Sequence, residues 1–446
     1  MKILAIETSC DETAIAVLEA KGGFKNPRFK ILSNIVSSQI KLHEPFGGVV
    51  PNLAKREHQR NLIPVLIKGM RESKLLKNAK RKTQNAKPQL KSQNQKILNP
   101  IFYILKREPK LLSRTLQFLE KYRAPKIDLI AVTRGPGLEP ALWVGLNFAK
   151  ALAITWGKPL IGINHMEGHA LSVLLKAKPK IKDQNPKLQI KNKKYSDLEK
   201  INFPTLALLV SGGHTELVLM KGWLKYKVIG KTRDDAAGEA FDKTARILGL
   251  GYPGGPAIAA SAAKFLISNF KFLNKSQIPN KSKIKNLKSY TLNPGGCILS
   301  LPRPMLNSKN FDFSFSGLKT AVLYLVQNLK KNKQFNKKII PAIAAEFQQA
   351  VIDVLISKTI KAAEKYKAKT IILGGGVAAN KELRKQMTVA IKKELRLPAT
   401  NYKLPAISFC GDNASMIAIT AYFQAQKNPP KHKSFLRIRA DGNLIL

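Results

Sequence analysis

Two segments of this chain, one at its start and one near its middle, share the same layout. Residues 3–19 (ILAIETSCDETAIAVLE) and residues 206–220 (LALLVSGGHTELVLM) each hold two apolar runs separated by a short polar turn. Apolar runs of this length with a turn between them predict a β-hairpin with polar residues at its tip. Because the layout occurs twice, we interpret it as an internal duplication that builds two similar lobes.

The other apolar segments alternate between short runs typical of buried strands and longer runs with helical periodicity. Strand-like runs include LIAVT, LIGIN and TIIL, and helix-like runs include LWVGLNFAKALAIT, EAFDKTARILGL and NASMIAITAYFQAQ. A chain of 446 residues, 44% of them hydrophobic, can bury a sizeable core. We therefore expect an α/β fold, with a first lobe over 1–175 and a second over 201–446 that contains a helical subdomain over about 233–345.

Four Lys- and Asn-rich stretches interrupt this alternation, at about 74–100, 176–200, 267–300 and 328–338. None has an apolar period that would build a core, so we interpret them as surface insertions. The chain has 77 Lys and Arg against 28 Asp and Glu, a net charge of +49, and its basic residues are not confined to these stretches. Such a charge favours RNA or an anionic membrane as a partner, although Lys-rich insertions also occur as merely solvated surface.

The cysteines and the N-terminal residues favour a reducing cytosol. Cys10, Cys297 and Cys410 are widely spaced and odd in number, which suits neither a disulfide framework nor a CxxC metal site. Glu7 and Asp11 interrupt the region where a signal peptide would be apolar, and no run of about 18 apolar residues occurs. We expect a cytoplasmic protein that does not span a membrane.

The most specific local motif is HMEGH, in which His165 and His169 follow the strand-like run LIGIN. A spacing of four residues places both imidazoles on one face of a helix, within reach of one divalent ion. The alternative is a pair of polar residues at an exposed helix start. Zinc proteases use HExxH, whereas Glu167 occupies the third place here, so the motif disfavours a peptidase.

The tips of the two predicted hairpins carry the next candidates. In Ser211-Gly212-Gly213, glycines let backbone N–H groups approach an anion, although a tight turn needs glycines too. In the matching turn, Asp11 and Glu12 could hold a cation or orient a nucleophile, or could be ordinary exposed turn acids.

Three further motifs lie at helix ends. Asn380 in GGGVAAN and Asp412 in CGDN each precede a helix, so each could contact a ligand or simply cap that helix. DDAAGEAFD, which contains Asp242, and YPGGP, which contains Gly255, bracket one helix, and periodicity alone assigns them no role.

Taken together, these motifs resemble those of the bacterial tRNA N6-adenosine threonylcarbamoyltransferases, formerly described as O-sialoglycoprotein endopeptidases. The matching strings, in the family's order, are ETSCDET, AVTRGPGL, HMEGH, LVSGGHTEL, DDAAGEAFDKTARILGLGYPGGP, FSFSGLKTA, GGGVAAN and CGDNASMIA. The resemblance covers the chain outside the four basic stretches, which typical members lack. It implies two actin-like, ribonuclease-H-like lobes with a cleft between them, as in the actin and sugar-kinase superfamily.

The resemblance also implies an activity and a site. Such enzymes transfer a threonylcarbamoyl group from threonylcarbamoyl-AMP to the N6 amine of adenosine 37 in tRNAs that read codons starting with A, and they release AMP. By motif, one divalent metal per subunit, iron (Fe2+) in preference to zinc, would be held by His165, His169 and Asp412. The adenylate would be held by a set of residues drawn from both hairpin and helix-end motifs: Leu209, Val210, Ser211, Gly212, Gly213, Asp242, Gly255 and Asn380. Asp11 and Glu12 would lie near the reacting centre.

The partners implied are tRNA, a shorter non-catalytic paralogue and a small P-loop ATPase. Two other classes stay open from the residues alone. An actin-like ATPase or small-molecule kinase would use ATP and Mg²⁺ in the same cleft and would need no histidine pair. A metalloprotease would need a general base beside a metal-bound water.

Overall fold

The computed structural model describes residues 1–79, 99–175, 201–272, 290–292, 297–398, 401–430 and 434–446, and two five-stranded sheets form its centre. The first sheet has the order β3-β2-β1-β4-β5. Its strands are β1 (Lys2–Glu7), β2 (Glu12–Lys21), β3 (Arg28–Ser38), β4 (Leu129–Gly135) and β5 (Leu160–Asn164). The hairpin strands β1, β2 and β3 are antiparallel, whereas β4 and β5 run parallel to β1.

The second sheet repeats this topology with the order β8-β7-β6-β11-β12. Its strands are β6 (Thr205–Val210), β7 (Thr215–Gly222), β8 (Lys225–Lys231), β11 (Thr370–Gly374) and β12 (Tyr402–Lys403). Here too the three hairpin strands are antiparallel and the last two are parallel to the first of them. The prediction of a two-lobed α/β fold is confirmed, and the matching strand orders support the duplication.

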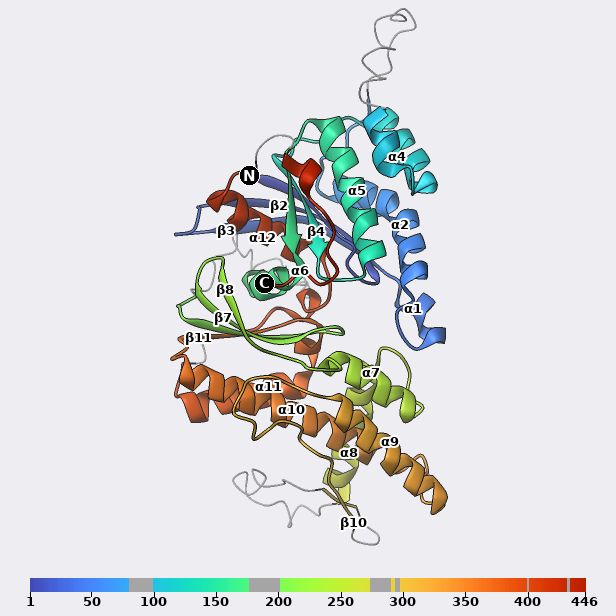
Figure 1. Cartoon of the computed structure of the whole chain (residues 1–446), viewed down its shortest axis with the longest axis vertical. Coiled ribbons are helices and arrows are strands. Elements are labelled where there is room, and N and C mark those ends of the chain that lie inside the picture. The colour runs from blue at the N-terminus through green and yellow to red at the C-terminus, as the bar shows by residue number, and fades with distance from the viewer. Residues whose placement is uncertain (80–98, 176–200, 273–289, 293–296, 399–400, 431–433) are drawn as a thin grey trace, which may run out of the picture.

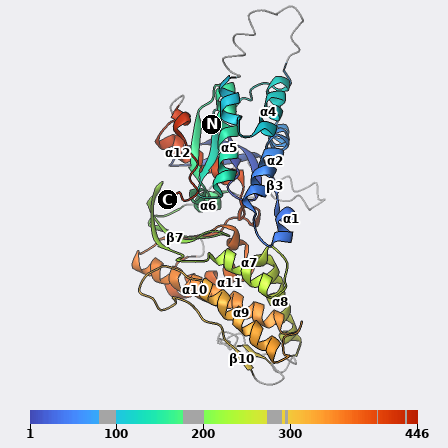
Figure 2. The same ribbon diagram turned by 45° about the vertical axis from the view of Figure 1, so that its right-hand side comes forward.

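Helices cover the outer face of each sheet (Figures 1 and 2). The first lobe has α1 (Ile40–His43), α2 (Pro51–Glu72), α4 (Pro109–Lys121) and α5 (Glu139–Trp156), while its α6 (His165–Leu171) lies between the two sheets. The second has α7 (Ala237–Ile247), α8 (Gly254–Phe272), α9 (Ser316–Lys331), α10 (Ile340–Lys365) and α11 (Lys381–Ala390). Helix α10 is long and apolar enough to cross a membrane by length and composition, but it is mostly buried in the second lobe.

Alternation along the strands divides most of the buried apolar side chains among three large cores. In β1, Leu4 and Ile6 pack toward α2 and α5, while Ile3 and Ala5 face the opposite side of the sheet. In β6, Leu208 faces the helices α7 to α11, while Leu209 faces the first lobe. Successive strand residues point to opposite faces, so both sheets contribute to a shared middle core. Helix α6 and helix α12 (Ala414–Lys427) fill that middle layer.

The end of the chain packs on the first sheet, whereas the predicted second lobe was given the bounds 201–446. Helix α12 packs on β1, β2 and α6, so it completes the first lobe. The segment after it also returns to that lobe, because Asp441 N–H donates to the carbonyl of Arg134 and Gly137 N–H donates to that of Gly442. An apolar helix pattern predicts a buried face but does not say which sheet that face will cover.

The predicted insertions differ from the structure at their edges. Residues 328–331 are the last turn of α9, and a folded turn follows them. Part of 267–300 is regular as well, since α8 extends to Phe272 and β9 (Tyr290–Leu292) pairs with β10 (Cys297–Leu299), whose last residue is buried. At the edges of 74–100, residue 78 bridges to residue 122 and residues 99–105 are helical. The stretch 176–200 lies outside the described residues.

Candidate metal centre and the turns around it

Helix α6 carries both histidines of HMEGH and begins where β5 ends. The side chain of Asn164 caps it by accepting hydrogen bonds from the N–H groups of Met166 (2.8 Å) and Glu167 (3.3 Å). His165 and His169 are both buried, and their ring centroids lie 4.6 Å apart. The helix therefore presents two imidazoles on one face.

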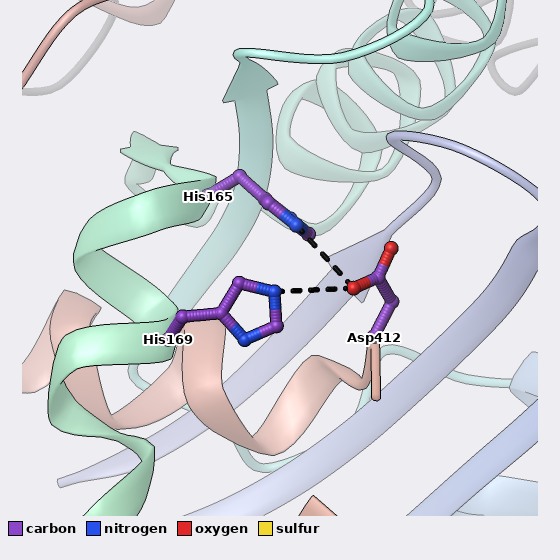
Figure 3. A group of neighbouring side chains, drawn as sticks. All are labelled: His165, His169 and Asp412. Atoms are coloured by element: carbon purple, nitrogen blue, oxygen red, sulfur yellow. Dashed lines mark ion pairs between the residues drawn. The ribbon is translucent and has the colours of Figure 1, made fainter. Parts of the chain in front are cut away.

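Asp412 reaches these rings from the far end of the sequence, just before α12 (Figure 3). Its Oδ1 lies 3.3 Å from Nε2 of His165 and 3.2 Å from Nε2 of His169. The cap of α12 is instead Asn413, which accepts a hydrogen bond from Met416 N–H at 3.2 Å. One ligand atom from each of the three side chains lies within 4.8 Å of the others, so the structure contains a possible metal site.

The side chains of this site are better arranged to bind a metal ion than to form hydrogen bonds with one another. His169 is fully buried, yet among the described residues neither of its ring nitrogens makes a hydrogen bond. Its Nε2 is at ion-pair distance from Asp412, but not in the direction that a hydrogen bond needs. Buried polar atoms without a partner are uncommon, and two imidazoles with one carboxylate are a normal ligand set for Fe(II) or Zn²⁺.

Burial and neighbouring charges shift the pKa values of all three side chains. Burial opposes the charged form of His165, but the carboxylates of Asp412 and Glu7 outweigh it and raise the pKa of His165 well above its usual value. Burial likewise opposes ionisation of Asp412, but the two imidazoles lower its pKa. Burial lowers the pKa of His169.

Glu7, at the end of β1, orients the first histidine and was missed as a site residue. It is fully buried, and its Oε2 lies 3.1 Å from Nδ1 of His165. The same oxygen accepts the hydroxyl of Thr133 at 2.5 Å, while Oε1 accepts the N–H of Ser9 at 2.6 Å. A carboxylate on Nδ1 keeps the proton there and leaves Nε2 free to bind a metal. The sequence signal that could have identified Glu7 is an acidic residue at the end of an apolar strand.

The acidic turn between β1 and β2 lies beside the triad. Asp11 is buried, and its carbonyl accepts the N–H of Gln39 at 2.9 Å. The carboxylate of Glu12 accepts the hydroxyl of Ser38 at 3.1 Å. Burial, with the neighbouring charges of Asp11 and Asp412, raises the pKa of Glu12 well above its usual value. Of the two predicted catalytic acids, Glu12 thus lies within electrostatic reach of Asp412.

A buried histidine outside the predicted set supports this turn. Nε2 of His58 donates to the carbonyl of Cys10 at 2.9 Å, and its Nδ1 accepts the hydroxyl of Thr13 at 2.8 Å. This pair of contacts defines the neutral tautomer, and burial lowers the pKa of His58 accordingly. No pattern in the sequence distinguishes this histidine from an ordinary residue on α2.

The glycine turn of the second lobe leaves its backbone open. Ser211 N–H donates to the carbonyl of His214 at 2.8 Å, which closes the turn. A Cβ placed at Gly212 or Gly213 would meet no atom within 4 Å, so a ligand could approach the backbone there. Burial lowers the pKa of His214 to about 4, with a further contribution from His165. This turn therefore lies close to the histidine pair of the first lobe.

Asp242 and Gly255 lie at the same junction between the lobes. The carboxylate of Asp242 accepts the N–H of Gly254 at 2.6 Å, which joins α7 to the start of α8. Burial raises the pKa of Asp242, and the charge of Asp11 raises it further, so acids of the two lobes face each other. A Cβ at Gly255 would meet nothing within 4 Å.

The side chains of three other predicted binding residues are engaged in the fold. Leu209 and Val210 are fully buried in separate cores, so only their backbone could contact a ligand. Asn380 caps α11, and its Nδ2 donates to the amide oxygen of Gln348 at 2.8 Å. For Asn380 the capping alternative holds.

Glu167, the middle residue of HMEGH, faces a cavity away from the three candidate ligands. Its carboxylate accepts a hydrogen bond from Gln424, and it lines a cavity of about 530 Å³ with Arg134 and Tyr226. None of the three candidate ligands lines that cavity. Burial raises the pKa of Glu167 to about 7. The glutamate next to the histidines is thus not placed as the general base of a metalloprotease.

Comparisons with known proteins agree with the motifs. The family TsaD, tRNA N6-adenosine threonylcarbamoyltransferase, matches residues 30–80, 109–190 and 187–419. The tRNA N6-adenosine threonylcarbamoyltransferase of Thermosipho africanus is 39% identical over 95% of this chain and 94% of its own length. The enzyme of the same name from Geobacillus kaustophilus is 38% identical over 95% of this chain and 92% of its own length.

A solved structure of a ROK hexokinase from Thermus thermophilus covers 96% of this chain and 100% of its own, at 13% identity and a TM-score of 0.39. The fold assignment rests on the topology of the two sheets. The family match spans most of the sequence, and the named relatives cover nearly all of it. The chain belongs to the tRNA N6-adenosine threonylcarbamoyltransferase family, whose members modify tRNA.

Proposed function

We propose that this enzyme transfers the threonylcarbamoyl group of threonylcarbamoyl-AMP to the N6 amine of adenosine 37 in tRNAs that read codons starting with A. In this reaction the amine nitrogen bonds to the carbamoyl carbon, the bond from that carbon to the phosphate oxygen breaks, and AMP leaves. An exocyclic amine is a poor nucleophile, so positioning against an activated carbonyl is the main requirement. The convergence of His165, His169 and Asp412 beside two open turns is the observation that carries the proposal.

One divalent metal per subunit, Fe2+ in preference to Zn²⁺, is assigned to His165, His169 and Asp412. When bound, it supplies a Lewis acid that anchors phosphate or polarises the carbamoyl oxygen. Glu7 holds the proton of His165 on Nδ1, which keeps Nε2 directed at the site.

The adenylate is assigned to the two glycine turns at the junction of the lobes. A Cβ at Gly212 or Gly213 would meet no atom within 4 Å, so a phosphate could approach the backbone of this turn, where N–H groups are suitable donors. Asp242 and Gly255 are assigned to the same ligand, and so are Leu209, Val210 and Asn380, whose side chains are engaged in the fold and which would act through their backbone. Asp11 and Glu12 are assigned to the reacting centre, where a carboxylate could accept the proton that the amine releases.

The enzyme is proposed to act in the cytoplasm with a shorter non-catalytic paralogue and a small P-loop ATPase. Purified protein, reconstituted with these partners, threonylcarbamoyl-AMP and unmodified tRNA, should yield threonylcarbamoyladenosine by nucleoside analysis. A His169→Ala variant under the same conditions is the control and should yield none. Absence of the nucleoside with wild-type protein would refute the proposal, and ATP turnover by this protein alone, without the P-loop ATPase and without tRNA, would indicate a kinase or ATPase instead.

A further inference from the structure

The C-terminal half of α9 and the turn after it, residues 323–338, form what we call the basic tip. Helix α9 buries Leu318, Val322 and Val326 against the second lobe. Its opposite side exposes Leu323 (38%) and Tyr324 (65%). Gln327, Asn328 and Lys331 follow Tyr324 at intervals of three, four and seven residues, and all three are exposed. Helical geometry places these side chains on one outward face.

The turn that follows α9 is folded rather than loose. Lys333 adopts a left-handed backbone with φ 55°, and the N–H groups of Gln334 and Phe335 both donate to the carbonyl of Leu329, at 2.8 and 3.1 Å. This pattern is a normal helix C-cap. Phe335 packs on the core of the second lobe, and the Lys330 ammonium lies 5.3 Å from the centre of its ring. The fold therefore holds the lysines of the turn at defined positions.

The charge of the basic tip is uncompensated within the described chain. Five lysines, at 330, 331, 333, 337 and 338, lie in nine residues, and no Asp or Glu occurs between Asp312 and Glu346. None of the ion pairs formed among the described residues includes any of these lysines. Like charges held together in this way repel one another, so the arrangement favours a polyanionic partner.

The position of the basic tip suits the substrate of the family. Helix α9 packs on α7, which carries Asp242 of the lobe junction, and then runs outward to the lower end of the molecule (Figures 1 and 2). Its 16 residues span about 24 Å. A tRNA with its reacting base at the metal centre must extend its stem outward from the junction. Helical RNA is recognised through phosphates and hydroxyls, for which lysine and tyrosine side chains are suitable donors.

We propose that the basic tip binds the phosphate backbone of the tRNA stem that adjoins the reacting base. The inference rests on tRNA as the substrate, and it adds a docking surface to the proposed site. The predicted insertion at 328–338, which is part of the basic tip, would then bind the substrate instead of being passive solvated surface.

The test compares two charge-matched variants. The tip variant carries Lys331→Gln, Lys333→Asn, Lys337→Gln and Lys338→Gln. Asn tolerates the left-handed backbone, and Lys330 is kept because it contacts Phe335. The control variant changes four exposed lysines of the same lobe outside the tip: Lys221→Gln, Lys225→Gln, Lys227→Gln and Lys392→Gln. Binding of unmodified tRNA is measured from about 0.05 to 0.5 M salt, without donor substrate.

Each lysine that contacts a phosphate contributes about 0.7 to 0.9 to the slope of log affinity against log salt. The tip variant should therefore flatten the slope by about one to three and weaken binding at 0.1 M salt by about tenfold to a thousandfold. The control should keep the wild-type slope within about 0.5. In turnover, the tip variant should raise KM for tRNA with little change in kcat.

Equal losses in both variants would show a diffuse charge effect and would overturn the proposal. A tip variant that keeps the wild-type salt slope for tRNA would also overturn the proposal. This holds even if the variant loses binding to vesicles containing phosphatidylserine or to an acidic partner protein. Because tRNA binding is measured without catalysis, these outcomes are separate from a failure to form the modified nucleoside.

Discussion

Replacing Glu7 by Gln should weaken metal binding through the tautomer of His165. In the wild type, the Glu7 carboxylate can only accept, so the Nδ1 of His165 at 3.1 Å carries the proton and Nε2 is free. An amide NH2 placed at the same position favours an unprotonated Nδ1, which moves the proton to Nε2. The substitution keeps the size of a side chain that is completely buried, and Oε1 can still accept the N–H of Ser9.

Changes in such supporting hydrogen bonds typically weaken metal affinity by about 10- to 100-fold, which is about 1.4 to 2.7 kcal/mol. Metal-stripped wild type and Glu7→Gln would be titrated with Zn²⁺ against a competing chelator, and their free energies of unfolding compared in urea. Ser9→Ala is the control, because it removes the other neighbour of Nδ1, at 3.2 Å, while leaving the carboxylate. It should lose less than about fivefold. A folded Glu7→Gln protein with wild-type affinity would refute the tautomer argument.

Three further substitutions test other parts of the site. His169→Ala should abolish stoichiometric metal, seen by elemental analysis, and reduce turnover at least about 100-fold while the circular dichroism spectrum is kept; a retained metal would contradict the ligand assignment. Glu167→Gln should remove a pH dependence of stability: the raised pKa of about 7 means that the folded state binds the extra proton, so wild-type stability falls by up to about 3 kcal/mol as the pH rises from about 4.5 to 7. Urea titrations of both proteins across this pH range measure the effect, and an equal loss of stability in wild type and Glu167→Gln would contradict the role of Glu167. Gly375 has a φ of 88°, and Gly375→Ala would place a Cβ 2.3 Å from the carbonyl oxygen of Val210. We therefore expect the free energy of unfolding to fall by about 1 to 3 kcal/mol in the same urea assay. An unchanged midpoint would show that the turn can move.

Most of the fold was accessible from sequence because its signals are local. Apolar runs of strand length around SCDET and SGGHT predicted both hairpins, and their repetition predicted two lobes. The destination of α12 was not accessible in this way. Its apolar residues predict burial, but packing on β1 and β2 depends on contacts between segments about 400 residues apart.

The same difference between local signals and contacts distant in sequence applies to the candidate site. The spacing of His165 and His169 follows from helix periodicity, so their proximity could be predicted from residue numbers alone. Asp412 and Asn413 were indistinguishable as cap and ligand, since both residue types accept hydrogen bonds from helix N–H groups. The contact of Glu7 with an imidazole depends on the parallel pairing of β1 with β4, which no local pattern reveals.

The return of α12 to the first sheet has a consequence for biosynthesis. During translation, β1 to α6 leave the ribosome early, but the middle face of their sheet lacks part of its apolar cover until residues 414–427 have been synthesised. The first lobe can therefore finish folding only after the second has been synthesised. A fragment that stops before α12 should expose apolar surface, bind chaperones and aggregate, whereas supplying α12 as a separate peptide should rescue its solubility.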